Sequence, residues 1–246
     1  DRENFSNKGN IATITIDTGA ISEADELKTF HDNMRTLKGT AVVNATNVTN
    51  ISGTYAQLTA LIALSDANTI TNFDGRNLIE DTATISVANA NTLSGKTTGT
   101  VTATLGTISL ADSAAITETG HAYTITLSDT TVDAGLLTTL DGKTTTAINI
   151  NSVTTMTGTV AEVAQFFTDK DNFSNTGNIA TITIDAGAVG DAGALKNLHN
   201  NMRTLRTNAV VNATNITTIS GTYAELSSLV TYAGASTITN FSGRNL

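Results

Sequence analysis

The side chains that could perform acid–base chemistry are sparse in this sequence. The chain has three histidines, His31, His121 and His199, and no cysteine. A histidine in nucleophilic catalysis needs an Asp, Ser or Cys partner in a defined geometry, and the residues around these histidines identify no such partner. His31 and His199 occupy the same position in two similar segments, so we expect both on a helix surface. The sequence assigns no catalytic residue, and we predict that the chain is not an enzyme.

The arginines show the same repetition. Arg35 corresponds to Arg203, and Arg76 corresponds to Arg244. An array of repeats seldom carries an active site in every copy, so we expect these side chains to contact neighbouring carbonyl groups or aspartates. A solenoid polysaccharide lyase would need Arg, Lys and carboxylates clustered on one face, and the sequence shows no such cluster.

One acidic stretch could hold a divalent cation. Asp169, Asp171 and Asn172 lie within four residues, and Asp1–Asn4 is the matching stretch. Calcium prefers oxygen ligands of this kind, but an acidic stretch in a solvated loop is the favoured interpretation. Calcium is a possible partner that nothing else supports, and we predict no metal or cofactor site. The sequence has no Gly-rich phosphate loop and no zinc-ligand spacing.

Threonines recur in Thr-x-Thr pairs that predicted strands would turn outward. A flat array of such pairs could order water and bind ice, or bind cell-envelope glycans. The alternative is that Thr is simply a favourable residue on an exposed strand face. The pairs are Thr13/Thr15, Thr102/Thr104, Thr124/Thr126 and Thr181/Thr183.

The strands and helices that would position these side chains belong to a repeated sequence. Residues 43–58 return almost unchanged at 211–226, and residues 1–78 match residues 169–246 without a gap at about two-thirds identity. Self-similarity at a fixed offset is typical of repeat architectures. We predict that residues 1–168 form one long repeat and that residues 169–246 start a second copy in a continuous solenoid.

Each coil of the repeat is predicted to contain a strand, a bend and a capped helix. Three segments fit a capping box, in which a Thr hydroxyl and a Gln or Glu side chain bond to each other's backbone amides: Thr54–Gln57, Thr159–Glu162 and Thr222–Glu225. The apolar residues that follow have helical spacing. Ahead of the helices the apolar spacing is two, three and three, as in Val43, Ala45, Val48 and Ile51.

A small polar residue recurs in the predicted bends. We expect it to bond to backbone groups of the next coil, although Asn also tolerates turns for its own conformational reasons. The positions are Asn47, Asn89, Ser152 and Asn215.

Residues 79–120 differ from the rest. The predicted strands there, Ile85–Val87 and Val101–Leu105, lie about 15 residues apart, and no helical stripe fits between them. We predict helix-free coils of a parallel β-solenoid. Antiparallel hairpins are the open alternative, because Gly95, Gly99 and Gly106 could form tight turns.

The composition suits thin coils better than a large globular core. Of 246 residues 39% are hydrophobic and 4% aromatic, with no Trp and no Pro. The net charge of −9 disfavours nucleic acid and anionic membranes as partners. The absence of Cys excludes disulfides, and no apolar run reaches the roughly 20 residues of a membrane span. Because the chain begins at Asp1 without a signal peptide, we expect it to be cut from a longer protein.

The phrases Ile-Ser-Gly-Thr-Tyr-Ala-Glu-Leu at 219–226 and Met-Thr-Gly-Thr-Val-Ala-Glu-Val at 156–163 lie among Thr-, Asn- and Ala-rich strands. In this the chain resembles tandem repeats of giant cyanobacterial cell-surface proteins of the non-flagellar swimming motility type. The resemblance implies a secreted, non-catalytic role at the cell envelope and transfers no functional residue.

Together these features predict an α/β fold, a right-handed parallel solenoid of strand–helix coils interrupted by helix-free β coils around 79–120. The predicted function is that of an elongated extracellular or cell-surface spacer in motility or adhesion, with adjacent repeats of the same chain as its partners. The alternative is a glycan- or ice-binding module that uses the exposed Thr and Asn faces.

Overall fold

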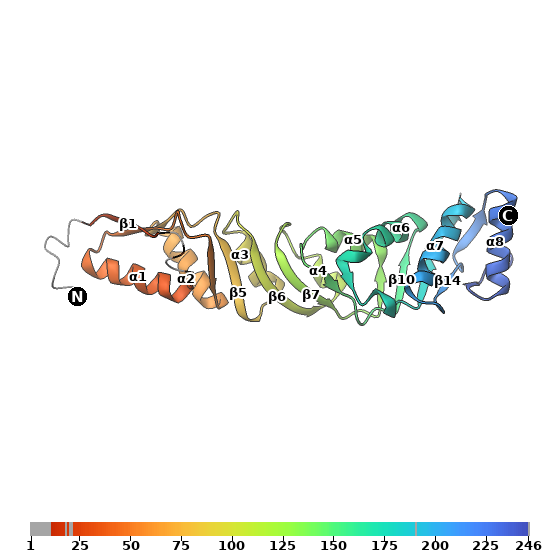
Figure 1. The fold of residues 1–246 in the computed structure, drawn as a ribbon, viewed down its shortest axis with the longest axis horizontal. Helices are drawn as coiled ribbons and strands as arrows, with labels where there is room; N and C mark the ends of the chain where they lie inside the picture. Colours follow the sequence, from red (N-terminus) through yellow and green to blue (C-terminus); the bar gives the residue numbers. More distant parts are fainter. Residues whose placement is uncertain (1–10, 18, 20–21, 190, 246) are drawn as a thin grey trace. The chain divides into compact units, whose positions relative to one another are not determined.

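A computed structural model describes residues 11–17, 19, 22–189 and 191–245. The chain forms two compact units. The first contains residues 1–106 and 115–124, and the second contains residues 107–114 and 125–246. Each unit is an alternation of short strands and helices (Figure 1).

The first unit has two sheets. Its helices are α1 (Ala24–Leu37), α2 (Tyr55–Asp66) and α3 (Val87–Ser94). One sheet has the order β1 (Thr13–Thr15), β2 (Val42–Asn44), β4 (Ile70–Thr71). In the other, β5 (Asn77–Thr84) lies between β3 (Asn50–Gly53) and β6 (Val101–Ile108).

The second unit continues the pattern. Its helices are α4 (Leu110–Ser113), α5 (Ala134–Asp141), α6 (Val160–Thr168), α7 (Ala192–Leu205) and α8 (Tyr223–Gly234), with 3-10 turns at Lys170–Asn172 and Thr176–Asn178. One sheet has the order β8 (Thr131–Asp133), β10 (Thr155–Gly158), β12 (Thr181–Ile184), β14 (Val210–Asn212), β16 (Ile238–Thr239). β9 (Ile148–Asn149) pairs with β7 (Ala122–Leu127) and with β11 (Phe173–Ser174), and β13 (Gly187–Val189) pairs with β15 (Ile216–Ile219).

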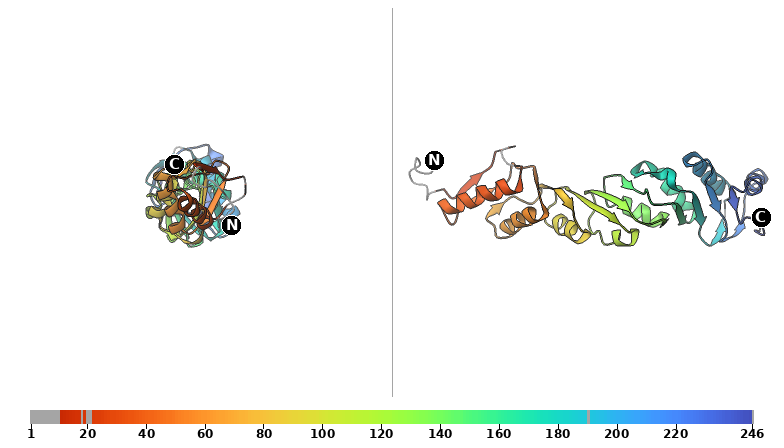
Figure 2. Two further views of the ribbon diagram at one scale, coloured as in Figure 1. Left: turned by 90° about the vertical axis from the view of Figure 1, so that its left-hand side faces the viewer. Right: turned by 90° about the horizontal axis from the view of Figure 1, so that it is seen from below.

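The strand pairs in the described part of the chain are parallel, and within each unit a strand pairs with strands of the coils before and after it. Met156 of β10, for example, lies between Val132 of β8 and Ile182 of β12. Parallel strands need crossover connections, and the helices are part of them. The helix of one coil contacts the helix of the next, α1 with α2 and α2 with α3 in the first unit (Figure 2). The fold is therefore α/β with all-parallel sheets, which is compatible with a parallel solenoid.

The core of each unit consists mostly of medium-sized apolar side chains. Each coil contributes inward residues from its strands and its helix, such as Val43, Ile51 and Leu58 of one coil, all at most 1% exposed. Phe73 and Phe166 are among the largest fully buried side chains. Stacked coils bury these small faces against their neighbours, which explains how a chain with few aromatic residues forms a core.

Secondary structure recurs at the sequence offset. α7 begins at Ala192 and α1 at Ala24, and α8 matches α2 in the same way. The sheet of β8, β10, β12, β14 and β16 crosses the boundary between residues 168 and 169 without interruption. The capping boxes at Thr54, Thr159 and Thr222 are all present, so that prediction is confirmed.

The prediction of helix-free coils over 79–120 is wrong. This stretch contains α3 and α4. Ser86 accepts a hydrogen bond from the Asn89 amide and begins α3, so Val87 and Asn89 are helical instead of lying in a strand and a bend. Ser109 begins α4 through the Asp112 amide. Both helices are too short to show a recognisable apolar stripe.

The hairpin alternative is also wrong, because β5 and β6 are parallel. Gly95 ends α3 as its C-cap. Gly99 allows close approach of the chain, since a Cβ there would lie 2.5 Å from the Arg76 carbonyl oxygen. Gly106 has φ +71° inside β6, where a Cβ would meet the Thr84 side chain at 2.6 Å.

Candidate functional site

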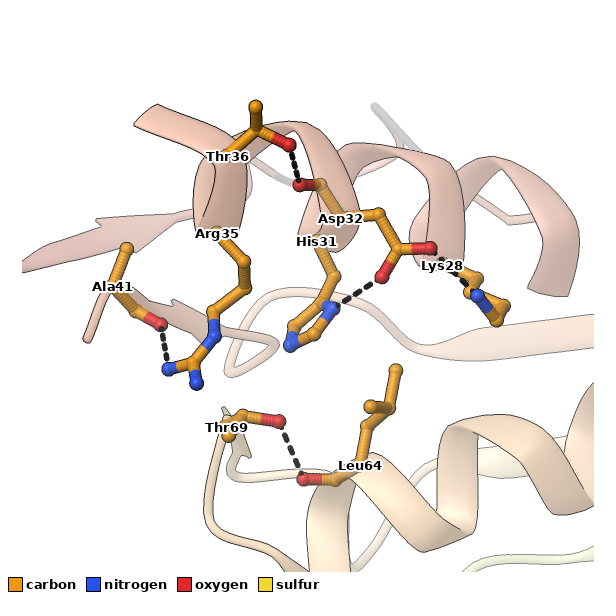
Figure 3. Close-up of polar contacts among 8 residues, drawn as sticks. All are labelled: Lys28, His31, Asp32, Arg35, Thr36, Ala41, Leu64 and Thr69. Carbon is orange, nitrogen blue, oxygen red and sulfur yellow. Dashed lines mark hydrogen bonds and ion pairs between the residues drawn. The ribbon is translucent and has the colours of Figure 1, made fainter. Parts of the chain in front are cut away.

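His31 lies in α1, and its ring points toward the segment that follows α2 (Figure 3). The side chain is buried, with 4% exposure. Its Nδ1 lies 3.0 Å from Oδ1 of Asp32, whose other carboxylate oxygen accepts a hydrogen bond from Lys28 Nζ at 2.6 Å. This bond, with a smaller contribution from His31, lowers the pKa of Asp32. The prediction of a surface histidine is wrong, because the next coil covers this side of the helix.

His199 shows what this position does in the second copy. It is 5% exposed and stacks on Tyr232 of α8, with ring centroids 3.9 Å apart and planes 15° apart. Its Nε2 lies 2.9 Å from Thr237 Oγ1, and that hydroxyl is 3.0 Å from the Tyr232 carbonyl oxygen. The Nδ1 atom of His199 lies 3.2 Å from Oδ1 of Asn200, an acceptor, so that contact is a hydrogen bond only when Nδ1 carries the proton. Burial lowers the pKa of His199, and the bond to Asn200 acts in the opposite direction.

His199 therefore joins two neighbouring coils, whereas the buried Nε2 of His31 has no hydrogen-bond partner among the described residues. Thr69, the counterpart of Thr237, donates to the Leu64 carbonyl oxygen at 3.0 Å, and it lies near the His31 ring in Figure 3. A hydrolytic site would need a nucleophile aligned with the histidine. Here the threonine hydroxyl is bonded to a backbone carbonyl in both copies. In the second copy the bond from His199 to Thr237 clamps α7 to the turn after α8.

His121 holds a strand in place. It lies next to β7, and its Nδ1 is 3.1 Å from the Val101 amide, from which it accepts a hydrogen bond. A nitrogen that accepts cannot carry a proton, so this histidine is neutral in the folded chain. Its burial lowers the pKa, while the nearby charge of Glu118 acts in the opposite direction. The ring also lies 5.5 Å from that of buried Tyr123, whose pKa is raised by burial.

The arginines contact backbone carbonyls, as predicted for Arg35, Arg76 and Arg244. Arg76 is the fullest case, because its Nη1 donates to the carbonyl oxygens of Ala45, Thr46 and Val48 at 3.4, 2.7 and 2.5 Å. Arg244 donates to Thr214 at 2.9 Å, and Arg35 to Ala41 at 3.3 Å. Arg76 and Arg244 thus each hold the bend of the preceding coil.

Asparagine side chains form a second set of contacts between coils. Asn47 Nδ2 donates to the Ile16 carbonyl oxygen at 3.1 Å, and Asn215 Nδ2 donates to Ile184 at 3.3 Å. The predicted bond to the next coil is therefore wrong in direction, since the partner lies in the preceding coil. The strand before each of these bends pairs in parallel with a strand of the preceding coil, β2 with β1 and β14 with β12.

The strand asparagines form hydrogen-bonded pairs that recur three times. In each pair a bend asparagine with positive φ donates from Nδ2 to Oδ1 of a strand asparagine in the coil before. The donor–acceptor distances are 2.8, 2.8 and 2.9 Å for Asn72–Asn44, Asn175–Asn149 and Asn240–Asn212. We call these the asparagine pairs. The sequence pattern could have revealed two of them, because Asn44 and Asn72 recur 168 residues later as Asn212 and Asn240.

The acidic stretch does not assemble a cation site. Asp171 has an exposed side chain that pairs with Lys170, and Asn172 donates to Asp141 Oδ2 at 3.0 Å. Burial raises the pKa of Asp141, which the Asn172 bond opposes. A polar hollow of about 290 Å³ lies beside these residues. Among the described residues no group of three or more His, Cys, Asp or Glu could hold a metal, and Asp1–Asn4 lies outside them.

Threonines line up across strands of the second unit. Thr131, Thr155 and Thr181 are in register in β8, β10 and β12, and Thr157 is in register with Thr183. The columns do not continue as threonine, because Val210 and Asn212 follow in β14 and Asp133 stands beside Thr157 in β8. The Thr157 hydroxyl lies 3.4 Å from the Val132 carbonyl oxygen and Asn212 lies 3.5 Å from Thr183 Oγ1, so part of the column is hydrogen-bonded internally.

Comparisons with protein-family models, with curated proteins and with solved structures find no match to this chain. Within the described residues there is no helix with the length and apolar character needed to span a membrane. Among the repeated side chains, His199, Arg76, Arg244 and the asparagine pairs all make contacts between neighbouring coils.

Proposed function

We propose that the chain is a non-catalytic structural segment of a very large secreted or cell-surface protein, in which stacked coils act as an elongated spacer in motility or adhesion. We infer that the coils wind as a right-handed parallel solenoid, the hand that parallel strand–crossover–strand connections adopt.

One observation carries the proposal. The five-stranded sheet of the second unit contains β8 and β10 from the end of the first copy and β12, β14 and β16 from the second. Ile182 of the second copy pairs with Met156 of the first, and both are fully buried. Copies that share one sheet and one core extend each other, and stability then grows from nearest-neighbour contacts.

The polar residues support the same function. The contact of His199 with Thr237, the bonds of Arg76 and Arg244, and the asparagine pairs all join one coil to the next. Side chains with catalytic potential are thereby occupied in holding the stack at a fixed register. A spacer needs this, because a register slip between coils would shorten or bend it.

The test is a length series measured by small-angle X-ray scattering. Chains with one and two further copies of residues 1–168 inserted in frame should show a maximum dimension that rises by a constant increment, with an unchanged cross-section. A globular assembly of repeats would instead thicken as its length in residues grows, and that result would refute the spacer function.

The register of Thr131, Thr155 and Thr181 favours one alternative, a module that binds ice or glycans through this strand face. Thermal hysteresis and a glycan array test it, with Thr155→Val and Thr181→Val as matched variants of nearly equal volume. Activity in either assay that the variants abolish would establish the alternative. Inactivity of the unmodified chain in both assays removes it.

A further inference from the structure

The last coil of the second copy leaves an apolar face open that its counterpart in the first copy buries. Val230 in α8 is 51% exposed, whereas its counterpart Ile62 in α2 is 6% exposed. Leu226 is half-buried, while its counterpart Leu58 is fully buried. A hollow of about 670 Å³ lies beside this face, with Val230, Ile238 and Phe241 in its lining. We call this surface the α8 face.

The first copy shows what covers such a face. There α3 packs against α2, and β5 pairs with β3 so that Leu78 and Ile79 lie opposite Ile51 and Ser52. The apolar part of this cover comes from Ala90 and Leu93 of α3, which are both fully buried.

The second copy already begins the same pairing. In the first copy the backbone amide of Asn77 donates to the Thr49 carbonyl oxygen at 2.9 Å. In the second copy the backbone amide of Asn245 donates to the carbonyl oxygen of Thr217, the counterpart of Thr49, at 3.3 Å. The Ile219 amide donates in turn to the Asn245 carbonyl oxygen at 2.8 Å. The backbone at Asn245 is thus set in the register that β5 has on β3.

On these grounds we propose that the α8 face binds a coil of the same polypeptide with the chemistry of residues 79–106, a parallel strand followed by a serine-capped helix that buries Ala90 and Leu93. The inference rests on the proposed function and names the partner that extends the stack. In the first copy Asp66 pairs with Lys96, and Asp74 accepts a hydrogen bond from the Thr98 amide. The second copy has Gly234 in place of Asp66 and Ser242 in place of Asp74, so neither acceptor is present there. Recognition at the α8 face therefore depends on apolar packing and backbone pairing, without these two contacts.

A second copy of the whole chain does not fit this face in register. Ile14 in β1 is half-buried, while its counterpart Ile182 is fully buried beside Met156 of β10. The open side of β1 therefore matches a β10-type strand. The α8 coil ends in β16, which corresponds to β4. Head-to-tail stacking would omit the coils equivalent to residues 79–168.

The experiment uses the absence of cysteine in this chain. Val230→Cys provides a single thiol on the α8 face, and its labelling rate is compared with and without residues 79–106 repeated after Leu246. The extension should slow labelling by about tenfold or more, as a thiol in a covered site reacts only on local opening. Leu136→Cys, at a residue of α5 with 57% exposure, should label equally in both chains.

A matched extension carries Leu→Asp at the position copied from Leu93 and should leave Val230→Cys reactive. Equal labelling with and without the unmodified extension would overturn the proposal. Concentration-dependent protection in the unextended chain would also overturn it, by showing that a second copy covers the face. Protection by the extension in a chain that scatters as a compact globule would leave this inference standing while the spacer function fails.

Discussion

At the scale of single residues, the polar side chains matter through the coil they reach. Asn44 is the clearest example, because it joins three neighbours. Its Oδ1 accepts from the Thr46 amide at 3.0 Å and from Asn72 at 2.8 Å, and its Nδ2 donates to Thr15 at 3.2 Å. Two of these bonds cross to adjacent coils, so the side chain fixes their register.

Asn44→Ala should lower the free energy of unfolding by about 1–2 kcal/mol, because each lost bond contributes about 1 kcal/mol and some of the groups are rehydrated. Asn44→Asp keeps the accepting oxygen and loses only the donation to Thr15, so its effect should be smaller. Urea unfolding followed by circular dichroism gives both values. An alanine variant as stable as the original chain would show that the asparagine pairs add no stability.

The buried histidines predict how stability depends on pH. The folded pKa of His121 is lowered below its ordinary value of 6.5, so below that pH the unfolded chain binds more protons than the folded one. Stability present above about pH 6.5 should therefore fall as the pH drops toward the folded pKa. His199 acts in the same direction.

The matched variant is His121→Asn, whose oxygen can accept from the Val101 amide without titrating. Melting temperatures between pH 7.5 and 5.5 should fall less for this variant than for the original chain. Equal slopes for the two chains would contradict the assignment of His121 as a neutral acceptor.

Residue roles were predictable where they depend on the local sequence. The capping box at Thr159 needs only residues within one turn, and its prediction is confirmed. The burial of His31 and the direction of the Asn47 bond depend on which coil lies next to them. A linear pattern does not contain that information, and both predictions failed.

At the scale of elements, close approach between neighbouring turns sets the sequence of the coil boundaries. Gly99 illustrates this, since a Cβ would lie 2.5 Å from the Arg76 carbonyl oxygen and 2.6 Å from its carbon. These are backbone atoms that also take part in the stack, because the Thr97 hydroxyl donates to the same oxygen.

Gly99→Ala should destabilise the chain by about 1–3 kcal/mol, the usual cost of forcing an extra group into a packed site. Gly39→Ala is the control, because a Cβ there meets nothing within 4 Å. Chemical unfolding of the two variants separates this steric cost from the general effect of replacing glycine. Similar stabilities for both variants would rule out a close-packed turn at Gly99.

The existence of the longer helices and the main strands could be predicted from periodicity, but the short helices of residues 79–120 could not. α3 has eight residues and buries Ala90, Leu93 and Ser94, which is too few apolar positions to form a stripe. The available information was the cap, a Ser followed three residues later by Asn89 or Asp112. The sequence pattern identifies capping boxes with Gln or Glu, but it does not identify the caps of Ser86 and Ser109, which lack the returning side chain.

At the scale of the whole molecule, the proposed spacer function requires coils that stabilise one another in sequence order. The end of the second copy should then be the weakest part of its unit, since α8 buries only Leu229 where α2 buries Leu58, Leu61 and Ile62. The repeat itself was predictable from the sequence, because two-thirds of the positions coincide. The strand order was not, because spacing alone does not say which strands pair.

The most direct test of the stacked-coil account is the radius of gyration of the 246-residue chain in solution, measured by small-angle X-ray scattering. A compact globule of this length would have a value of about 18 Å. Stacked coils predict a value well above that, with the elongated profile of a particle whose cross-section is one coil. A value near 18 Å with a globular profile would contradict the account.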